Sequence, residues 1–342
     1  AANSHATHML AEFGVVFLMF SIGLEFSLPK LKSMRRNVFG LGLAQVALTI
    51  VVTMLCGGLM ARLLPSMFNI GWSASFALGG ALSMSSTAIV LKLLTERLEM
   101  ESEHGRRITS ILLFQDLAVV PLIILVPSLA HPGPDLMEDL LWAGLKACFV
   151  LFLLFFVGQT LLHRWFQIVV KRRSQELFML NLLLVTLGAA WITEVAGLSL
   201  ALGAFIAGML ISETEFRIQV EEDIKPFRDV LLGLFFISVG MMLDLRLVFD
   251  NLLLVLVLLS IPVLLKFGLI ALLARVFGAP PGVALRTGLG LAQGGEFGFV
   301  LLNQAGGLGL VDSGLVQLIL AAMVLSMLAT PFIFANFDRI VM

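Results

Sequence analysis

Long apolar stretches alternate with short polar ones along the whole chain. Eleven windows are apolar enough, over about 20 residues, to form membrane-spanning helices. They lie at 8–26, 38–61, 72–94, 107–127, 140–162, 177–195, 197–212, 229–244, 252–275, 284–305 and 314–336. The windows 197–212 and 229–244 are shorter than the others. The pattern predicts an all-α polytopic membrane protein.

The basic residues give this helix count a test, because loops on the cytoplasmic side of a membrane are enriched in Lys and Arg. Every second loop is basic, and these loops together hold most of the 22 Lys+Arg of the chain. The loops between them hold only Arg62 and Arg246, while Lys146 and Lys266 lie inside windows. The alternation predicts that the first window starts outside and that the C-terminus is cytoplasmic.

Two windows carry a helix-breaking stretch near the middle. The window 72–94 contains Ser83, Met84, Ser85, Ser86 and Thr87, and the window 284–305 contains Gly288, Gly290, Gln293, Gly294 and Gly295. Ser and Thr compete for backbone hydrogen bonds, and Gly does not favour the helical conformation. The two windows run in opposite directions, which is typical of secondary transporters built from inverted repeats. The alternative is that these small residues only allow close helix packing.

A carboxylate stands at the centre of the window 107–127. It belongs to Asp116, which follows the uncharged Gln115. A charge at this depth is costly, and such residues usually face a bundle interior or a water-filled cavity. We expect Asp116 to take up and release a proton or a cation, with the Gln115 amide beside it. The alternative is a salt-bridged Asp116 without a role in transport.

Lys266 is the natural partner of this carboxylate, since it lies near the middle of the window 252–275. Our hypothesis is an ion pair between Lys266 and Asp116 that breaks when a cation binds. The alternative is a static lysine that neutralises the negative ends of the broken helices. Glu25 and Glu296 are weaker candidates: Glu25 lies near a cytoplasmic helix end, and Glu296 follows the second helix break.

Composition supports a membrane protein and excludes several other classes. The chain has 342 residues, of which 59% are hydrophobic and 13% are charged, and a net charge of -1; its mean hydropathy is +1.03. This charge gives no indication of nucleic-acid binding. Cys56 and Cys148 lie in apolar stretches, and the five histidines are scattered, so neither a disulfide framework nor a metal site is expected. We find no motif that indicates an enzyme.

The chain resembles the Kef-type members of the monovalent cation:proton antiporter superfamily. The matching segments occur in order along nearly the whole chain: Ala11–Val16, Ile22–Glu25, Ser85–Ala88, Leu112–Asp116, Gly203–Gly208, Gly233–Met241 and Gln293–Phe297. One segment departs from the family pattern, because Gly295 replaces a usual serine. That change bears on ion selectivity more than on the fold.

The resemblance implies an NhaA-like inverted-repeat fold with two crossing discontinuous helices. Similar proteins have thirteen membrane helices, so two helices are expected before residue 1. The implied organisation has a first dimerisation-domain helix, a first core repeat, a linker helix, further dimerisation helices with an acidic cytoplasmic loop, and a second core repeat. Their ranges are 1–36, 37–130, 131–175, 176–246 and 247–342.

The resemblance also implies the activity, which is exchange of a monovalent cation, K⁺ first, for H⁺ in a one-to-one, electroneutral manner. It assigns the ion site to Gln115 and Asp116, charge compensation to Lys266, and the crossing to Ser83, Ser85, Ser86, Thr87, Gln293, Gly294, Gly295 and Glu296. No cofactor is expected in this chain; K⁺ and H⁺ are the transported ions. Alternatives are a Na⁺/H⁺ antiporter, a ligand-gated K⁺ efflux pathway resembling a channel, and a sodium-coupled symporter for organic anions.

The partners implied by the resemblance are membrane lipid, a second copy of the chain in a homodimer, and a cytoplasmic nucleotide-binding domain gated by glutathione and its adducts. That domain would follow the C-terminus, because this chain has no phosphate-binding glycine motif. The acidic loop with Glu221, Glu222 and Asp223 resembles the stretch that contacts it, although charged loops are often only solvated. The expected location is the bacterial inner membrane.

Overall fold

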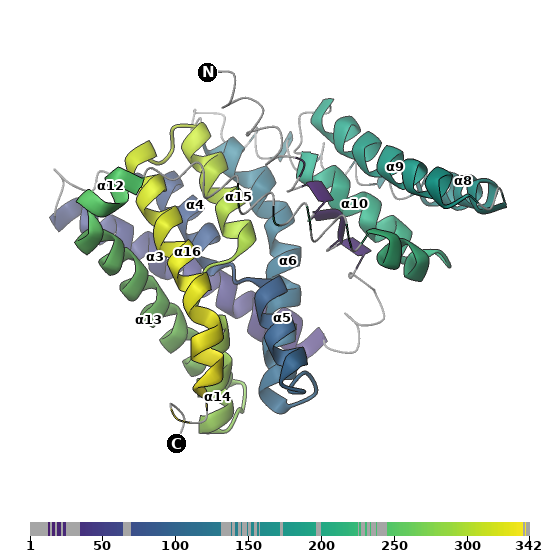
Figure 1. The fold of residues 1–342 in the computed structure, drawn as a ribbon. Coiled ribbons are helices and arrows are strands. Elements are labelled where there is room, and N and C mark those ends of the chain that lie inside the picture. The colour runs from purple at the N-terminus through teal and green to yellow at the C-terminus, as the bar shows by residue number, and fades with distance from the viewer. Residues whose placement is uncertain are drawn as a thin grey trace. The chain divides into compact units, whose positions relative to one another are not determined.

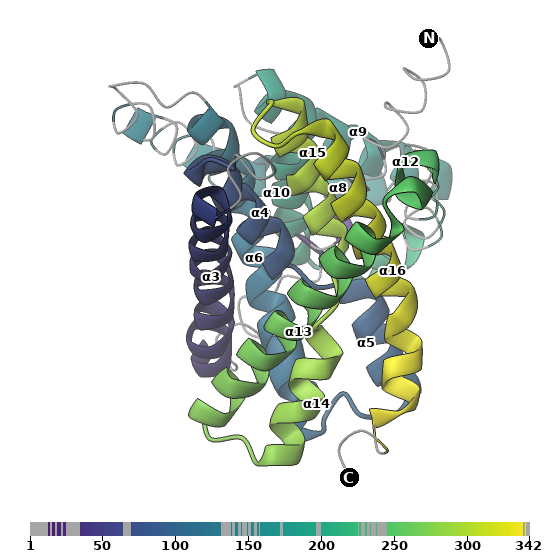
Figure 2. The same ribbon diagram turned by 90° about the vertical axis from the view of Figure 1, so that its left-hand side faces the viewer.

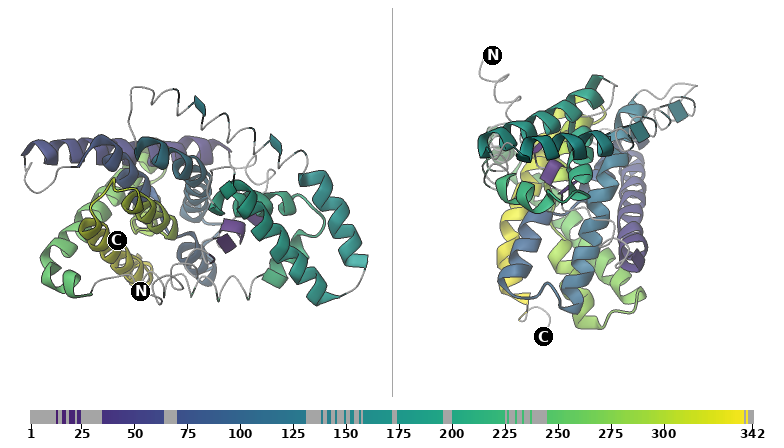
Figure 3. Two further views of the ribbon diagram at one scale, coloured as in Figure 1. Left: turned by 90° about the horizontal axis from the view of Figure 1, so that it is seen from above. Right: turned by 90° about the vertical axis from the view of Figure 1, so that its right-hand side faces the viewer.

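The computed structural model describes residues 35–63, 70–130, 159–171, 174–195, 200–224 and 245–337, and single positions within 13–24, 138–158, 226–237 and at 339. The predicted windows 8–26, 140–162 and 229–244 lie largely outside these residues. Within the described residues every regular element is a helix, as the ribbon views show (Figures 1 and 3).

The chain divides into two compact units, residues 1–32 with 133–242 and residues 33–132 with 243–342. The first unit contains α8 (Gln159–Lys171), α9 (Gln175–Val195) and α10 (Leu200–Ser212). Helices α9 and α10 approach closely at Gly203, where a Cβ would overlap the backbone of Ala189 and the hydroxyl of Thr193. These two helices correspond to the predicted windows 177–195 and 197–212.

The second unit contains the remaining helices. In chain order they are η1 (Asn37–Gly42), α3 (Leu43–Leu63), α4 (Trp72–Ser83), α5 (Thr87–Glu96), α6 (Glu103–Ala130), α12 (Leu245–Asp250), α13 (Leu252–Val276), α14 (Pro281–Leu291), α15 (Glu296–Gly307) and α16 (Ser313–Ala335). Local sequence sets several ends: Pro281 starts α14, and the Asp312 carboxylate caps α16 by accepting from the backbone N–H of Gly314 at 2.9 Å.

Four of the described helices are long and apolar enough to cross a membrane: Asn37–Leu59, Glu176–Val195, Leu252–Val276 and Ser313–Ala335. A fifth results if the two parts of α6, Glu103–Val119 and Pro121–Ala130, form one span bent by 43°. Proline explains the bend, since Pro121 cannot donate the helical hydrogen bond to Leu117.

Two of the predicted spans are each a pair of helices. Helix α4 ends at Ser83 and α5 begins at Thr87, so residues 84–86 interrupt the first span. The second interruption, 292–295, is shorter than the sequence indicated, because α14 continues through Gly288 and Gly290. Gly288 instead provides close packing: a Cβ there would lie 2.8 Å from the carbonyl oxygen of Phe267 on α13.

The four half-length helices are arranged in two pairs. Helices α4 and α15 pack side by side at one end of the second unit, and α5 and α14 both lie toward the other end (Figures 1 and 2). The interruptions therefore lie at mid-height of this unit. A buried apolar cluster that includes Leu94, Ile111, Leu291 and Phe334 packs α5, α6, α14 and α16 together below them.

Candidate functional site

The two helix interruptions lie against each other. A Cβ on Gly295 would overlap the backbone of Ser85, so only glycine allows this approach. The Ser85 hydroxyl donates a 2.8 Å hydrogen bond to the carbonyl oxygen of Leu291, at the end of α14. Segments separated by about 200 residues in the sequence are thus joined at one point.

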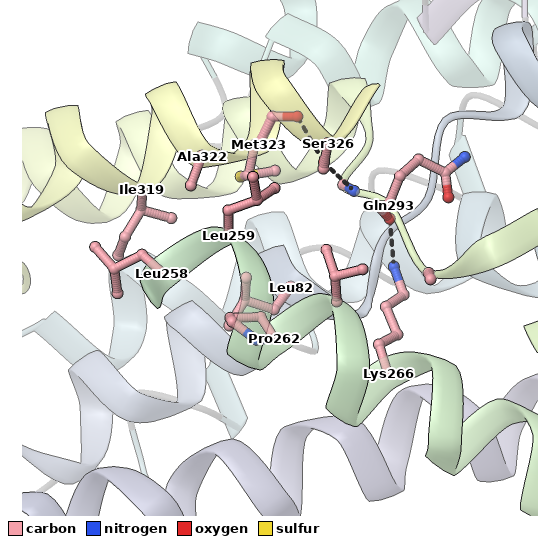
Figure 4. A pocket seen from close by; sticks show the side chains of 13 residues that line it. Leu82, Leu258, Leu259, Pro262, Lys266, Gln293, Ile319, Ala322, Met323 and Ser326 are labelled. Carbon is pink, nitrogen blue, oxygen red and sulfur yellow. Dashed lines mark hydrogen bonds between the residues drawn. The ribbon is translucent and has the colours of Figure 1, made fainter. Parts of the chain in front are cut away.

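The ammonium group of Lys266 also bridges the two interruptions. Its Nζ donates to the carbonyl oxygen of Met84 at 2.7 Å. It also donates to that of Gln293 at 2.9 Å (Figure 4). Both carbonyls follow the C-terminal ends of half-length helices, α4 and α14, where the helix dipoles are negative. The Lys266 side chain is only 5% exposed, so these bonds replace much of its hydration.

This placement differs from the ion pair hypothesised between Lys266 and Asp116. The two hydrogen bonds found for the Lys266 ammonium go to backbone carbonyls of the helix interruptions. The geometry matches the alternative in which the lysine neutralises the negative helix ends. The physical reason is that two converging helix termini offer an ammonium group two acceptors at once.

The carboxylate of Asp116 lies at the opposite kind of helix end. It projects from α6, is 5% exposed, and accepts from the hydroxyl of Thr87 at 3.0 Å and 3.4 Å to its two oxygens. Thr87 is the first residue of α5, and a helix N-terminus carries partial positive charge. The interruption thus presents a donor and a favourable field to a buried carboxylate.

Gln115 ties α6 to the first interruption through its amide. Its Oε1 accepts from the backbone N–H of Ser85 at 2.8 Å, and its Nε2 donates to Oε1 of Gln45 at 2.8 Å. Gln45, from α3, is fully buried, and its Nε2 donates to the carbonyl oxygen of Ser83 at 3.1 Å. Sequence analysis missed Gln45. The available signal was a long neutral polar side chain within the apolar window 38–61.

Several other polar groups at the interruptions bond to the helices around them. Ser83 donates to Gly80, Ser86 accepts from the N–H of Ile89, and the N–H of Gly294 donates to the Ser326 hydroxyl. Glu296 opens α15 and is 1% exposed. The Gln293 side chain is buried, and its amide points away from Lys266 (Figure 4). Neither end of this amide has a hydrogen-bond partner among the described residues.

A small cavity lies beside the Lys266 bridge, between α13 and α16 (Figure 4). Its volume is ≈ 20 Å³, room for about one water molecule. Apolar side chains such as Leu258 and Ile319 line most of it, and Lys266 and Ser326 supply polar groups. The arrangement suits small ions and water rather than a large organic substrate.

The remaining candidates lie elsewhere. Glu221 and Glu222 are exposed and Asp223 is half-buried, on a helical stretch of the first unit at 217–224. Glu25 lies outside the described residues. No group of three or more His, Cys, Asp or Glu side chains in the described part of the chain is arranged to hold a metal ion.

Two curated relatives are named as potassium carriers. The chain is 42% identical over 341 residues to K(+) efflux antiporter 1, chloroplastic, of Arabidopsis thaliana, a match that covers 98% of this chain and 28% of that protein. It is 44% identical over 327 residues to the putative K(+) efflux antiporter KefB of Alkalimonas amylolytica, with coverage of 95% and 48%. This chain therefore spans less than half the length of these relatives.

A solved structure shares the fold. The sodium proton antiporter MjNhaP1 from Methanocaldococcus jannaschii superposes with a TM-score of 0.68 over 99% of this chain and 86% of that one, at 15% sequence identity. A family model described as "Sodium/hydrogen exchanger, transmembrane" matches residues 1–336. A match of this extent shows that the chain belongs to the sodium/hydrogen exchanger family of transmembrane proteins.

Proposed function

We propose that this protein exchanges a monovalent cation, K⁺ first, for H⁺ by alternating access. In this proposal the fold is an NhaA-like inverted repeat, and α4–α5 and α14–α15 are its two crossing discontinuous helices. Asp116 and Gln115 form the exchange site. Asp116 supplies the carboxylate that carries either ion, and Gln115 fixes that part of α6 to the interruption.

One observation carries the proposal: a buried carboxylate, Asp116, stands at an interrupted helix in the middle of a transmembrane unit. One of its partners is the neutral hydroxyl of Thr87, whose lone pairs can turn toward a cation after the O–H has turned away. A proton and a cation compete for this one carboxylate, because binding of one weakens binding of the other. Their competition couples the two fluxes without further machinery.

Lys266 has the role of charge compensation in this scheme. It stabilises the two negative helix ends at Met84 and Gln293, while the positive end of α5 faces Asp116. The groups at the crossing keep these helix ends close to Lys266 and Asp116. They are Ser83, Ser85, Ser86, Thr87, Gln293, Gly294, Gly295 and Glu296. The lysine then remains in place while Asp116 changes its occupant.

The choice of K⁺ rests on the names of the two relatives, and a specific observation favours Na⁺ as the second candidate. The family is described as sodium/hydrogen exchangers, and the solved structure is of a sodium proton antiporter. A Na⁺/H⁺ antiporter would use the same carboxylate. The difference between the two candidates is the size and spacing of the ligands around it.

We further propose the cellular setting that the family resemblance suggests. The protein lies in the bacterial inner membrane as a homodimer, with the C-terminus on the cytoplasmic side. The unit 33–132 with 243–342 is the core that carries the ion, and the other unit provides the dimerisation helices. A nucleotide-binding regulatory domain would contact the protein near Glu221, Glu222 and Asp223.

The test is proton flux in liposomes that hold the purified protein, with KCl, NaCl or an organic cation added over a range of pH. We expect K⁺ to drive proton movement in the wild type, and Asp116→Asn to abolish it. The matched control is Asp250→Asn, since Asp250 is exposed at the end of α12 and should not affect exchange.

The other outcomes identify the rival functions. Exchange that persists in Asp116→Asn contradicts the assignment of the site. A response to Na⁺ alone selects the sodium antiporter. K⁺ movement without proton movement indicates a channel-like pathway, and uptake of an organic anion together with Na⁺ indicates a symporter.

A further inference from the structure

Among the backbone groups that the first helix interruption leaves without ordinary helical hydrogen bonds, two are bonded by side-chain amides. They are the carbonyl of Ser83, at the end of α4, and the N–H of Ser85, within the interruption. Both lie in the buried interior, where an unsatisfied polar group costs about 1–3 kcal/mol. The structure satisfies both groups with two glutamine side chains that are far apart in sequence.

These side chains form a continuous chain of hydrogen bonds across the interruption. The Ser85 N–H donates to Gln115 Oε1, Gln115 Nε2 donates to Gln45 Oε1, and Gln45 Nε2 donates to the Ser83 carbonyl. Gln45 Nε2 also donates to the Thr49 hydroxyl at 3.2 Å. Gln45 is 0% exposed and Gln115 is 1% exposed, so water does not compete for these bonds.

The orientation of both amides follows from the two backbone groups. The Ser85 N–H requires an oxygen from Gln115, and the Ser83 carbonyl requires an NH₂ from Gln45. The ends that remain, Gln115 NH₂ and Gln45 oxygen, are complementary. If Gln45 were absent, the Gln115 NH₂ would lose its shorter acceptor, at 2.8 Å, and would keep only the Ser85 hydroxyl, at 3.4 Å.

The chain of bonds bears on the exchange site because Gln115 and Asp116 are neighbours on α6. The interruption is held to this helix twice, by Gln115 at Ser85 and by Asp116 at Thr87. The contact of Gln115 with Ser85 therefore sets the distance between Thr87 and the Asp116 carboxylate. Discrimination between cations depends on the spacing and field of the coordinating oxygens, so a displaced interruption changes which cation fits.

We propose that Gln45 is a positioning residue that sets the cation selectivity of the Asp116 site through Gln115. The inference rests on the proposed exchange at Asp116, and Gln45 itself touches neither ion. Its role is to hold Gln115 in one orientation and thereby the segment Ser85–Thr87 at one distance from Asp116.

The decisive variant is Gln45→Met, which keeps the length of the side chain and removes its amide. We expect the apparent KM for K⁺ to rise roughly three- to tenfold, the effect of losing about one buried hydrogen bond, with a smaller change in kcat. The ratio of K⁺ to Na⁺ transport should change as well. Hydrogen exchange of the segment 83–87 should become faster, because the Ser85 N–H loses its fixed acceptor.

Gln304→Met is the matched control. Gln304 is also a glutamine on a helix of this unit, and its Nε2 donates to the carbonyl oxygen of Ile123 at 3.1 Å. This carbonyl has no helical hydrogen bond, because Pro127, four residues later, has no N–H to donate. This variant removes a comparable amide-to-carbonyl bond without touching the interruption. It should alter stability alone and leave the K⁺ to Na⁺ ratio unchanged.

Gln45→Glu provides a conditional rescue. A protonated carboxyl group offers one acceptor for Gln115 and one O–H donor for the Ser83 carbonyl, whereas the ionised form offers no donor. The K⁺ to Na⁺ ratio of this variant should approach that of the wild type as the pH falls and depart from it as the pH rises. The ratio is compared at each pH because Asp116 changes its protonation in every variant.

The results separate a positioning role from a structural one. If hydrogen exchange at 83–87 becomes faster in Gln45→Met while the KM and the K⁺ to Na⁺ ratio stay unchanged, Gln45 only stabilises the fold. If hydrogen exchange stays unchanged, the chain of amide hydrogen bonds does not hold the interruption in place. Either result overturns the proposal. If the wild type moves no cation, the proposed function fails. The inference about Gln45 then fails too, unless K⁺ slows hydrogen exchange of the segment 83–87 in the wild type and not in Gln45→Met.

Discussion

At the scale of single residues, each charge near the interruptions lies beside a helix end of the opposite sign. Lys266 meets the carbonyls that follow α4 and α14, and Asp116 meets the N-terminus of α5. The helices therefore solvate these side chains in place of water. Gln293 differs, because its buried amide makes no hydrogen bond to the described residues.

Lys266→Met should lower stability markedly. The methionine leaves the carbonyls of Met84 and Gln293 without a donor, a loss of roughly 2–5 kcal/mol for two buried acceptors. The measurement is thermal unfolding in detergent. Gln293→Leu is the control at the same place, since it removes an amide without bonds and should keep the wild-type melting temperature. Equal melting temperatures for all three proteins would show that the bridge contributes nothing.

Glu99, in the turn between α5 and α6, should make stability depend on pH. Burial raises its pKa, but the hydrogen bond with His104 at 3.1 Å and the charge of Arg97 lower it, and the net result is a pKa below the ordinary 4.5. A lowered pKa stabilises the fold above pH 4.5, and this contribution is lost as the pH falls through the folded-state pKa. Glu99→Gln should therefore destabilise the protein at pH 7 and converge with the wild type in acid.

The comparison for Glu99 is Glu101→Gln, at an exposed position in the same turn. That variant should follow the wild-type curve of melting temperature against pH. A constant difference between Glu99→Gln and the wild type at every pH would contradict the linkage.

Sequence could identify the charged residues of the site but not their partners. Asp116 and Lys266 stand out because a charge in an apolar window is rare and costly. Their separate placement at opposite helix ends depends on where the two interruptions meet, which no local pattern encodes. Gln45 does not stand out in the sequence, because a neutral amide in an apolar helix has a low free-energy cost and can occur there without a function.

At the scale of elements, the interruptions are short and their edges are set by contacts. The stretch Ser83–Thr87 indicated the first interruption to within a residue at each end, since Ser and Thr can take up the free backbone groups. The glycines at 288 and 290 were misleading. In a membrane helix, glycine also serves close packing, and only the neighbouring helix distinguishes the two uses.

Gly295→Ala should disrupt the contact between the interruptions. A methyl group there overlaps the backbone of Ser85, and backbone cannot move aside as a flexible side chain can. We expect a lower melting temperature, by an amount typical of overpacking, about 1–3 kcal/mol, together with reduced exchange activity.

Gly268→Ala, on α13, is the counterpart for this test. Nothing lies within 4 Å of a Cβ at that position, and alanine favours a helix by up to about 1 kcal/mol over glycine. Its melting temperature should equal or exceed that of the wild type. The contact would be unimportant if both alanine variants behaved alike.

At the scale of the whole molecule, most described helices correspond to predicted apolar windows, whereas α8 and α12 lie largely or wholly outside them. Membrane spans are predictable from sequence because every backbone group must be satisfied within its own helix. The assembly of two half-length pairs around Lys266 is not predictable in this way, since it depends on contacts such as Ser85 with Leu291. The windows 8–26, 140–162 and 229–244 stay predictions.

The exchange should be electroneutral if one carboxylate carries one monovalent cation or one proton. A net transfer of one charge would couple the rate to about 2.3 kcal/mol per 100 mV of membrane potential. We expect proton flux in liposomes to be the same with the potential clamped at zero and at -100 mV, by the same flux assay. A rate that follows the potential would require a second charge to move, for which Lys266 is the first residue to test.

The contact of Gly295 with Ser85 has an evolutionary consequence. The two interruptions are in contact, so a larger side chain in one of them changes the space available to the other. A larger residue at 295 is tolerable only if the backbone near 85 retreats, and a lost hydroxyl at 85 leaves the end of α14 unsatisfied. The serine that is usual at 295 in similar proteins therefore requires the backbone near 85 to lie farther from the second interruption than it does here.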